Sequence, residues 1–170
     1  IHTLEINGEN CLLISSVDIT ERKKAEQALR LSEELFFQTF DLNPLPMGVF
    51  SIVSRKCLEV NETFIKTSGY SRVELINNRL SDYNFWPCLK DIAKIYELID
   101  KDGFARNFET KLRIKSGEIR TALISATIIK WKGEKCLLAV GLDITELRRY
   151  ENELARLDRL NMIGQMAAGI

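Results

Sequence analysis

A near-repeat constrains the organisation of this chain more than any other feature of the sequence. Residues 8–13 read Gly-Glu-Asn-Cys-Leu-Leu and lead to Asp-Ile-Thr-Glu at 18–21. Residues 133–138 read Gly-Glu-Lys-Cys-Leu-Leu and lead to Asp-Ile-Thr-Glu at 143–146 with the same spacing. Each copy runs from a glycine turn through an apolar strand into a charged helix. Self-similarity at this long period indicates tandem domains rather than a stacked solenoid.

The repeat divides the chain into four predicted segments. Only the end of its first copy is present, so the chain is expected to begin inside a domain. We expect residues 1–20 to be the C-terminal strands of a preceding domain, 21–35 a linker helix, 36–145 a complete domain and 146–170 a coiled-coil helix that opens a further module. The first residue is Ile1 rather than Met, and both ends fall inside patterned sequence. We therefore expect the chain to be part of a longer polypeptide.

The complete domain is predicted to open with two strands and three helices. Apolar residues place the strands at 47–53 and 56–60. Asn61 is a good N-cap for a first short helix that ends at Gly69, and Ser71 opens a second helix through a capping box. Pro87 is expected in the first turn of a third helix that runs to about Asp100.

Three further strands are predicted to complete the domain. Alternating apolar and polar residues over 108–114 predict a half-buried strand, and glycine turns separate it from strands at 119–131 and 136–142. The order β-β-α-α-α-β-β-β implies an α+β domain, an antiparallel sheet with helices grouped on one face. The strand at 119–131 is apolar on both faces, so we expect the N-terminal helix or a partner subunit to cover the second face.

Four segments in this order resemble the PAS family: Val-Asn-Glu-Thr-Phe at 60–64, Ser-Gly-Tyr-Ser-Arg-Val-Glu-Leu at 68–75, Lys-Ser-Gly-Glu at 115–118 and Asp-Ile-Thr-Glu at 143–146. The resemblance covers 35–145, with a second partial match at 1–20. It implies a PAS fold, a five-stranded antiparallel sheet with short helices on one face, flanked by N- and C-terminal signalling helices. It also implies sensing and dimerisation rather than catalysis.

The Asp-Ile-Thr element is the part that, by this resemblance, joins the last strand to the output helix. Asp143 can accept N–H bonds at a helix start, Thr145 can bond nearby backbone, and Glu146 stands three residues after Asp143. We interpret these three residues as signal-coupling residues, together with their duplicates Asp18 and Thr20. The alternative is a plain helix cap without signalling content.

The resemblance also implies a ligand pocket between the sheet and the short helices. Its candidate lining is mostly aromatic: Phe50, Asn61, Phe64, Tyr70, Phe85, Trp86, Phe108 and Leu112. The alternative is that the aromatic members are ordinary core residues.

The cofactor, if there is one, is unknown from the sequence. The predicted helix at 87–100 contains no histidine, which argues against a histidine-ligated haem. The segment 76–81 contains no cysteine, which argues against a cysteine-adduct flavin. A non-covalent flavin flanked by Tyr70 and Trp86 stays open. With one histidine and no Cys-x-x-Cys pair, we expect no metal site.

Charge and hydropathy exclude some other classes. Lys+Arg and Asp+Glu both number 24, so no basic excess points to nucleic acid. No apolar run approaches the roughly 20 residues that span a bilayer. Four unpaired cysteines fit a reducing compartment, so we expect a cytoplasmic location. Whether the parent protein carries a membrane anchor elsewhere stays open.

The C-terminal segment predicts an output module. Leu147, Tyr150, Leu154 and Leu157 follow the 3-4-3 spacing of a coiled-coil seam. Residues 160–170 resemble the opening of the dimerisation and phosphoacceptor helix of sensor histidine kinases, and end before the histidine expected there. We therefore expect the chain to act as an input module without enzymatic activity of its own, in a parent that is a protein histidine kinase.

Several partners and alternatives follow. We expect a homodimer through the flanking helices, a kinase core and response regulator reached through the parent, and a small-molecule ligand in the sensing domain. A purely structural dimerisation module is one alternative. Another is a different output, such as a cyclic-dinucleotide synthase or a transcriptional regulator.

Overall fold

The computed structural model describes residues 2–6, 9–13 and 17–169. The chain divides into two compact units, residues 1–39 and 40–170. The first unit holds β1 (His2–Ile6) and β2 (Glu9–Leu13), which pair antiparallel. It also holds most of α1 (Thr20–Asp41), whose side chains are almost all exposed. The strands and the helix predicted for this part are present, but α1 continues to Asp41 instead of ending at residue 35. That β1 and β2 belong to a preceding domain stays a prediction.

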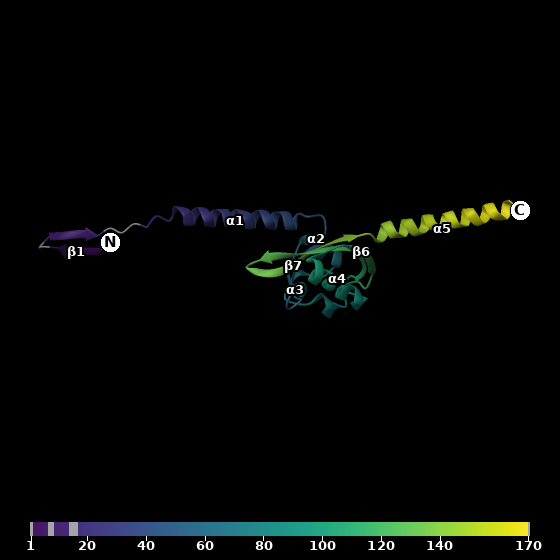
Figure 1. Ribbon diagram of the computed structural model, residues 1–170, viewed down its shortest axis with the longest axis horizontal. Helices are drawn as coiled ribbons and strands as arrows, with labels where there is room; N and C mark the ends of the chain where they lie inside the picture. The colour runs from purple at the N-terminus through teal and green to yellow at the C-terminus, as the bar shows by residue number, and fades with distance from the viewer. Residues whose placement is uncertain (1, 7–8, 14–16, 170) are drawn as a thin grey trace. The chain divides into compact units, whose positions relative to one another are not determined.

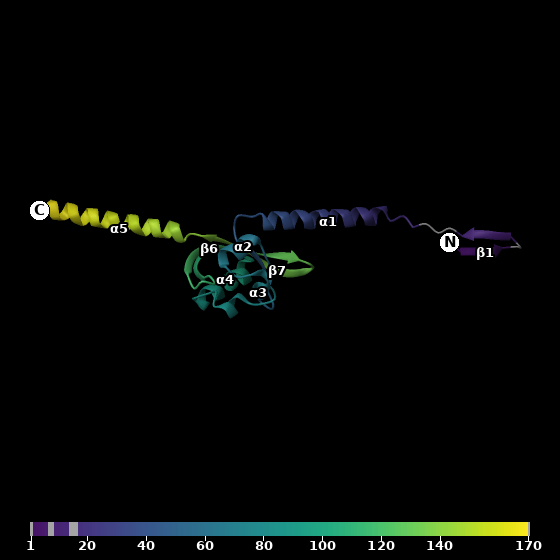
Figure 2. The ribbon, with the colours of Figure 1, turned by 180° about the vertical axis from the view of Figure 1, so that it is seen from behind.

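The second unit contains the five-stranded sheet and the remaining helices (Figures 1 and 2). Its first half comprises β3 (Met47–Ser51), β4 (Cys57–Val60), α2 (Glu62–Ser68), α3 (Arg72–Leu75), the 3₁₀ helix η1 (Leu80–Tyr83) and α4 (Leu89–Asp102). Its second half comprises β5 (Phe104–Arg113), β6 (Ile119–Trp131), β7 (Glu134–Asp143) and α5 (Thr145–Ala168). The strands are antiparallel throughout, in the spatial order β4-β3-β7-β6-β5. The predicted α+β class and element order are confirmed.

A two-residue turn sets the register of the two longest strands. Lys132 and Gly133 both have positive φ, 47° and 87°. This is the condition for the primed turn that matches the twist of a hairpin. Pairing therefore starts with Trp131 opposite Glu134 and continues without a slip to Ala122 opposite Asp143. The turn thus fixes which residues of β6 lie beside the end of β7.

The boundaries of α2 and α3 follow local capping chemistry, whereas the start of α4 does not. Asn61 caps α2, and Gly69 ends it with φ +76°. Ser71 and Glu74 form the predicted capping box of α3. The prediction for Pro87 is wrong, because α4 begins at Leu89 with Cys88 as its N-cap. Burial of the two preceding aromatic residues, together with a bond from Arg113 N to Phe85 O (2.9 Å), holds the chain extended past the proline.

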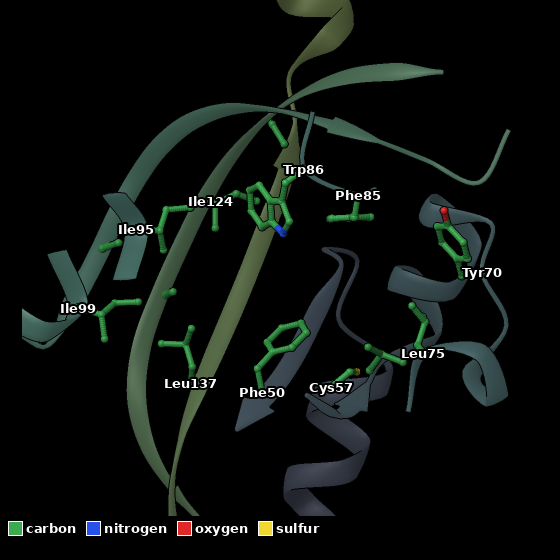
Figure 3. Close-up of a cluster of buried hydrophobic side chains, with 14 residues drawn as sticks. Phe50, Cys57, Tyr70, Leu75, Phe85, Trp86, Ile95, Ile99, Ile124 and Leu137 are labelled. Atoms are coloured by element: carbon green, nitrogen blue, oxygen red, sulfur yellow. The ribbon is translucent and has the colours of Figure 1, made fainter. Parts of the chain in front are cut away.

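The core lies between one face of the sheet and the helices. Figure 3 shows Ile95 and Ile99 of α4 directed toward Ile124 and Leu137 of the sheet. The opposite face of the sheet is apolar as well. There Val49 is completely buried, whereas Leu142 is 45% exposed. Whether α1 or a partner covers this second face stays a prediction.

A buried amide ties the entry of the second unit together. Asn61 is 0% exposed, and its Oδ1 accepts from the backbone N–H groups of Met47 and Phe64, each at 2.9 Å. Its Nδ2 donates to the carbonyls of Phe40 (3.0 Å) and Leu45 (2.8 Å). One side chain therefore satisfies the end of α1, the following loop, the start of β3 and the start of α2.

We expect Asn61→Ala to lower the free energy of unfolding by about 3 kcal/mol, since it removes the N-cap of α2 and several hydrogen bonds to buried or partly buried backbone groups. Urea denaturation followed by circular dichroism measures this. Asn78→Ala is the matched control, because the Asn78 amide is exposed and donates to Glu74 O (2.9 Å). The control is expected to lose less than about 1 kcal/mol. Equal losses in the two variants would contradict the central role of Asn61.

Candidate functional site

The junction between β7 and α5 is built around one carboxylate. Asp143 Oδ1 accepts from Thr145 N (2.9 Å) and from the Thr145 hydroxyl (2.6 Å). Ile144, which is buried, occupies the N-cap position between them. The Asp143 side chain thus fixes the bend by which the strand becomes a helix.

The Thr145 hydroxyl also reaches across to the neighbouring strand. Thr121 N donates to Thr145 Oγ1 (2.9 Å), and Ile144 N donates to Thr121 O (2.8 Å). The first residue of α5 is therefore bonded to β6 as well as to β7. A shift of β6 relative to β7 could not leave the start of α5 unchanged.

Two ion pairs connect the same region to β5 and β6. Arg120 Nη1 lies 3.1 Å from Asp143 Oδ2, and Arg148 of α5 pairs through Nε with Glu109 of β5 (3.1 Å). Burial raises the pKa of Asp143, but bonds from Thr145 and Arg120 outweigh it and hold the pKa below its ordinary value. The carboxylate is therefore ionised at neutral pH, as the bonding pattern requires.

Glu146 does not take part in the cap. It pairs with Arg149 (2.6 Å) on the exposed surface of α5. Because Ile144 is the N-cap, Glu146 lies one position too early to close a capping box, and its signal-coupling role stays a prediction.

The first copy of the repeat forms the same local turn. Thr20 N donates to Asp18 Oδ1 (2.9 Å), as Thr145 N does to Asp143. Side-chain and backbone hydrogen bonds from Thr20 lower the pKa of Asp18. The Asp-Ile-Thr sequence thus specifies one turn in both places, and its signalling role stays a prediction.

The space inside the core is small. A cavity of about 50 Å³ is enclosed by residues of α4 and the sheet together with Phe50 and Trp86. Drug-sized ligands occupy pockets of roughly 300 to 1,000 Å³, and a water needs only about 10 to 15 Å³. In this conformation the core cavity accommodates a few waters but neither a haem nor a flavin.

A larger pocket of about 220 Å³ lies beside the junction, and we call it the junction pocket. The loop before β3 and the end of α2 provide one side: Pro44, Leu45, Pro46, Thr67 and Ser68. The core side and β5 provide Phe85, Leu112 and Ile114. The strands that meet at the junction provide Arg120, Ala122, Gly141, Leu142 and Asp143. The pocket is therefore mostly apolar, with one charged pair at its edge.

The eight predicted pocket residues do not line a single cavity. Phe50 and Trp86 line the core cavity, whereas Phe85 and Leu112 line the junction pocket. The other aromatic residues pack in the core: the Phe64 ring stacks on Phe85, the Tyr70 ring lies 5.0 Å from Tyr83, and Phe108 packs on the buried cluster. The side-chain amide of Asn61 makes its hydrogen bonds to backbone groups and lines neither cavity.

Sequence reasoning missed Arg120 and Thr121. The signal that could have found them is the hairpin register. Pairing that continues outward from the Lys132–Gly133 turn places residues 120–122 beside residues 143–145.

The fold of the second unit, a five-stranded sheet with short helices, is similar to that of solved PAS domains. The PAS domain of an HTR-like protein from Haloarcula marismortui is 21% identical and superposes with a TM-score of 0.56, covering 72% of this chain and 100% of that one. A PAS domain from a two-component sensor histidine kinase is 19% identical with a TM-score of 0.56, covering 68% and 98%. An RNA-binding light-oxygen-voltage receptor is 12% identical with a TM-score of 0.64, covering 93% and 42%.

The family model described as PAS domain matches residues 46–146. The chain therefore belongs to the PAS domain family, and its complete domain is a sensor domain. It is also similar to the methyl sulfide methyltransferase-associated sensor of Methanosarcina acetivorans, with 27% identity over 154 residues. That alignment covers 86% of this chain but 15% of the relative, so the chain spans a small part of the relative's length. Among the described helices, none is long and apolar enough to span a membrane.

We expect Asp143→Ala to lower the free energy of unfolding by about 1 kcal/mol at pH 7, because the junction bonds are partly solvent-exposed. The folded-state pKa is lowered, so the carboxylate stabilises above its unfolded pKa of about 3.9 and loses this contribution as it protonates. The difference from the wild type should therefore shrink between pH 5 and pH 3. Urea denaturation at pH 7, 5 and 3 tests this.

Asp102→Ala is the control for that experiment, because Asp102 is an exposed carboxylate at the end of α4. It should change stability by no more than about 0.5 kcal/mol at any pH. A difference for Asp143→Ala that stays constant down to pH 3 would show that its charged form contributes nothing.

Proposed function

We propose that this chain is the signal-input module of a two-component sensor histidine kinase. In this proposal the PAS domain senses a ligand or partner, and the Asp-Ile-Thr junction passes the change to α5. The observation that carries the proposal is the bonding of the first turn of α5 to three strands, through Thr121, Asp143 and the Arg148–Glu109 pair. A displacement of one strand relative to another would therefore change the hydrogen bonds and the ion pair that hold the first turn of α5.

The rest of α5 supports the choice of a dimeric output. Leu147, Tyr150, Leu154 and Leu157 are between 51% and 63% exposed, although they form one apolar stripe. A heptad-spaced stripe is buried when two such helices associate as a coiled coil. A second copy of this chain is the proposed partner, since a parallel pair would align identical stripes.

We expect the chain to be a dimer and Leu154→Lys to weaken its association by at least about tenfold, because the variant places two charges in the apolar seam. Analytical ultracentrifugation over a range of concentrations measures this. Asn152→Lys introduces the same residue two positions earlier, on the opposite side of the helix, and should leave association unchanged. A wild-type chain that stays monomeric at 100 μM would contradict the dimer, because its free energy of association would then be weaker than roughly 5 kcal/mol.

The kinase output rests on the resemblance of residues 160–170 to the start of a phosphoacceptor helix. In the parent protein we expect incorporation of phosphate from ATP. We expect Asp143→Ala to change the rate of incorporation by about fivefold or more, because fivefold corresponds to the smallest coupling free energies that are typical between two sites. Asp102→Ala should stay within about twofold. Absence of phosphate incorporation by the wild type would refute the kinase, whereas equal rates in all three proteins would refute only the coupling role.

A purely structural dimerisation module is the second candidate, and the small core cavity favours it. That function requires the dimer but no response to any ligand. Equal phosphorylation rates together with a stable dimer would therefore support it.

A further inference from the structure

The hairpin turn between β6 and β7 is more basic than its fold requires. It lies at the end of the sheet opposite to the start of α5 (Figure 1) and contains three exposed lysines: Lys130, Lys132 and Lys135. The same positions in the first copy of the repeat are Glu5, Asn7 and Asn10. In the first hairpin Glu5 pairs with Asn10, just as Lys130 pairs with Lys135 in the second. The hairpin therefore forms without these lysines.

Two of the three lysines stand at unfavourable positions. Residues directly opposite in an antiparallel pair have Cβ atoms about 4.5 to 5.5 Å apart, so the charges of Lys130 and Lys135 repel one another. Lys132 has a φ of 47°, a conformation that asparagine adopts more readily than lysine. Within the part of the chain that the structure describes, none of the three forms an ion pair. An anion from outside the chain would relieve this repulsion.

The neighbouring turn between β3 and β4 adds two more positive charges. Ser51 pairs with Cys136, so residues 52–56 extend past the same end of the sheet as the lysine turn. Arg55 and Lys56 are exposed on this turn, and the Arg55 guanidinium lies 4.5 Å from the centre of the Tyr96 ring. We call five residues on the two turns the basic tip: Arg55, Lys56, Lys130, Lys132 and Lys135.

The positive charge of the basic tip is confined to the end of the sheet. The chain as a whole has a formal net charge of zero. On the two turns, residues 52–56 and 130–135, Glu134 is the acidic residue. Glu97 and Asp100 of α4 border a shallow depression beside Arg55, on the side of the domain. The surface that fits an anionic partner is therefore the end formed by the two turns.

An exposed valine indicates which anionic partner fits this end. Val53 lies on the β3–β4 turn and is 94% exposed. The phosphate surface of a nucleic acid offers an apolar side chain no gain. An anionic bilayer offers charged headgroups to the basic residues and, directly beneath them, an apolar layer that a short side chain can enter. Two turns that end at the same place also suit a flat surface.

We propose that the basic tip binds the surface of an anionic lipid bilayer, with Val53 entering the boundary between headgroups and acyl chains. Because α5 starts at the opposite end of the sheet, this contact leaves the junction between β7 and α5 away from the bilayer. The proposal does not depend on a kinase output, since it concerns residues of the PAS domain alone.

The test is sedimentation of the 170-residue chain with lipid vesicles. We expect binding to vesicles of equimolar phosphatidylcholine and phosphatidylserine that is at least about hundredfold stronger than binding to phosphatidylcholine alone, at about fivefold for each basic residue near the surface. Raising the salt from about 0.1 M to about 1 M shortens the Debye length from about 10 Å to about 3 Å, so binding should weaken strongly.

A charge-matched pair of variants locates the contact. The triple variant Lys130→Glu, Lys132→Asn and Lys135→Asn introduces the residues of the first copy, so the hairpin should form and binding should fall by at least about hundredfold. The control variant carries Lys66→Asn, Lys90→Glu and Lys111→Asn. It makes the same change in net charge at exposed lysines of α2, α4 and β5, and should lose less than about threefold.

A further variant tests the apolar part of the contact. Val53→Asn should weaken binding by about fivefold, less than the complete burial of a valine would give. This loss should persist at high salt, because it does not depend on charge. Circular dichroism shows whether each variant keeps the fold, and Val53→Asn still decides the question if the triple lysine variant does not fold.

The outcomes separate a lipid surface from other anions. Equal binding to the two kinds of vesicle, or equal losses in the triple variant and its charge-matched control, would overturn the proposal. So would tighter binding to a short DNA duplex or to polyglutamate than to the anionic vesicles, or a Val53→Asn variant that binds as the wild type does. Lipid binding that depends on the basic tip supports the proposal even if the parent incorporates no phosphate.

Discussion

The buried amide of Asn61 is the contact on which the second unit depends. A side-chain amide can both accept and donate hydrogen bonds, and here both capacities are used on buried or partly buried backbone groups. Because these groups belong to the end of α1, the loop after it, β3 and α2, one residue sets how the chain enters the sheet. The loop so placed also forms one wall of the junction pocket.

Entry and exit of the second unit meet at the same end of the sheet. Gly141 N, on β7, donates to Pro46 O at the start of β3 (2.9 Å). The segment after α1 is thereby joined to the strand that leads into α5. The junction pocket lies where these segments converge, whereas the core cavity lies deeper, between α4 and the sheet. A molecule in the junction pocket would therefore contact the connections of both flanking helices, and it would touch the core cluster at Phe85 and Ala122.

Much of the fold could be predicted from the sequence, because its elements follow from local rules. Capping residues, glycine turns and alternating hydrophobicity act over a few residues. The N-caps Asn61 and Ser71 and the turn at Lys132–Gly133 could therefore be predicted from the sequence. Pro87 was not, since tertiary burial of its aromatic neighbours overrode the local preference. The site was only partly predictable. The bond from Thr145 to Asp143 is local, but the contacts of Arg120 depend on strand register.

The predicted ligand pocket was less successful than the predicted fold, because its eight residues do not line a single cavity. Aromatic residues in a sheet-and-helix domain mark the interior, but composition does not determine whether they fill it or enclose a void. Here the Phe64 ring stacks on Phe85 and the Trp86 ring lies edge-on to Phe85, contacts that occupy the space a large cofactor would need. The junction pocket lies outside these ring contacts, between the loop before β3 and the ends of β6 and β7.

The strength of the contacts at the junction between β7 and α5 limits the free-energy difference between two arrangements of that junction. Beyond its first turn α5 exposes its apolar stripe, so within this chain the helix is oriented by a few partly exposed hydrogen bonds and ion pairs. Such contacts are each worth about 1 kcal/mol or less. Two arrangements of the junction can therefore differ by only a few kcal/mol. A ligand shifts that balance only by the difference between its affinities for the two arrangements. Under the proposed function, a small molecule that gains one hydrogen bond in one arrangement and loses it in the other would supply a difference of this size, so the weakness of the junction would make it responsive.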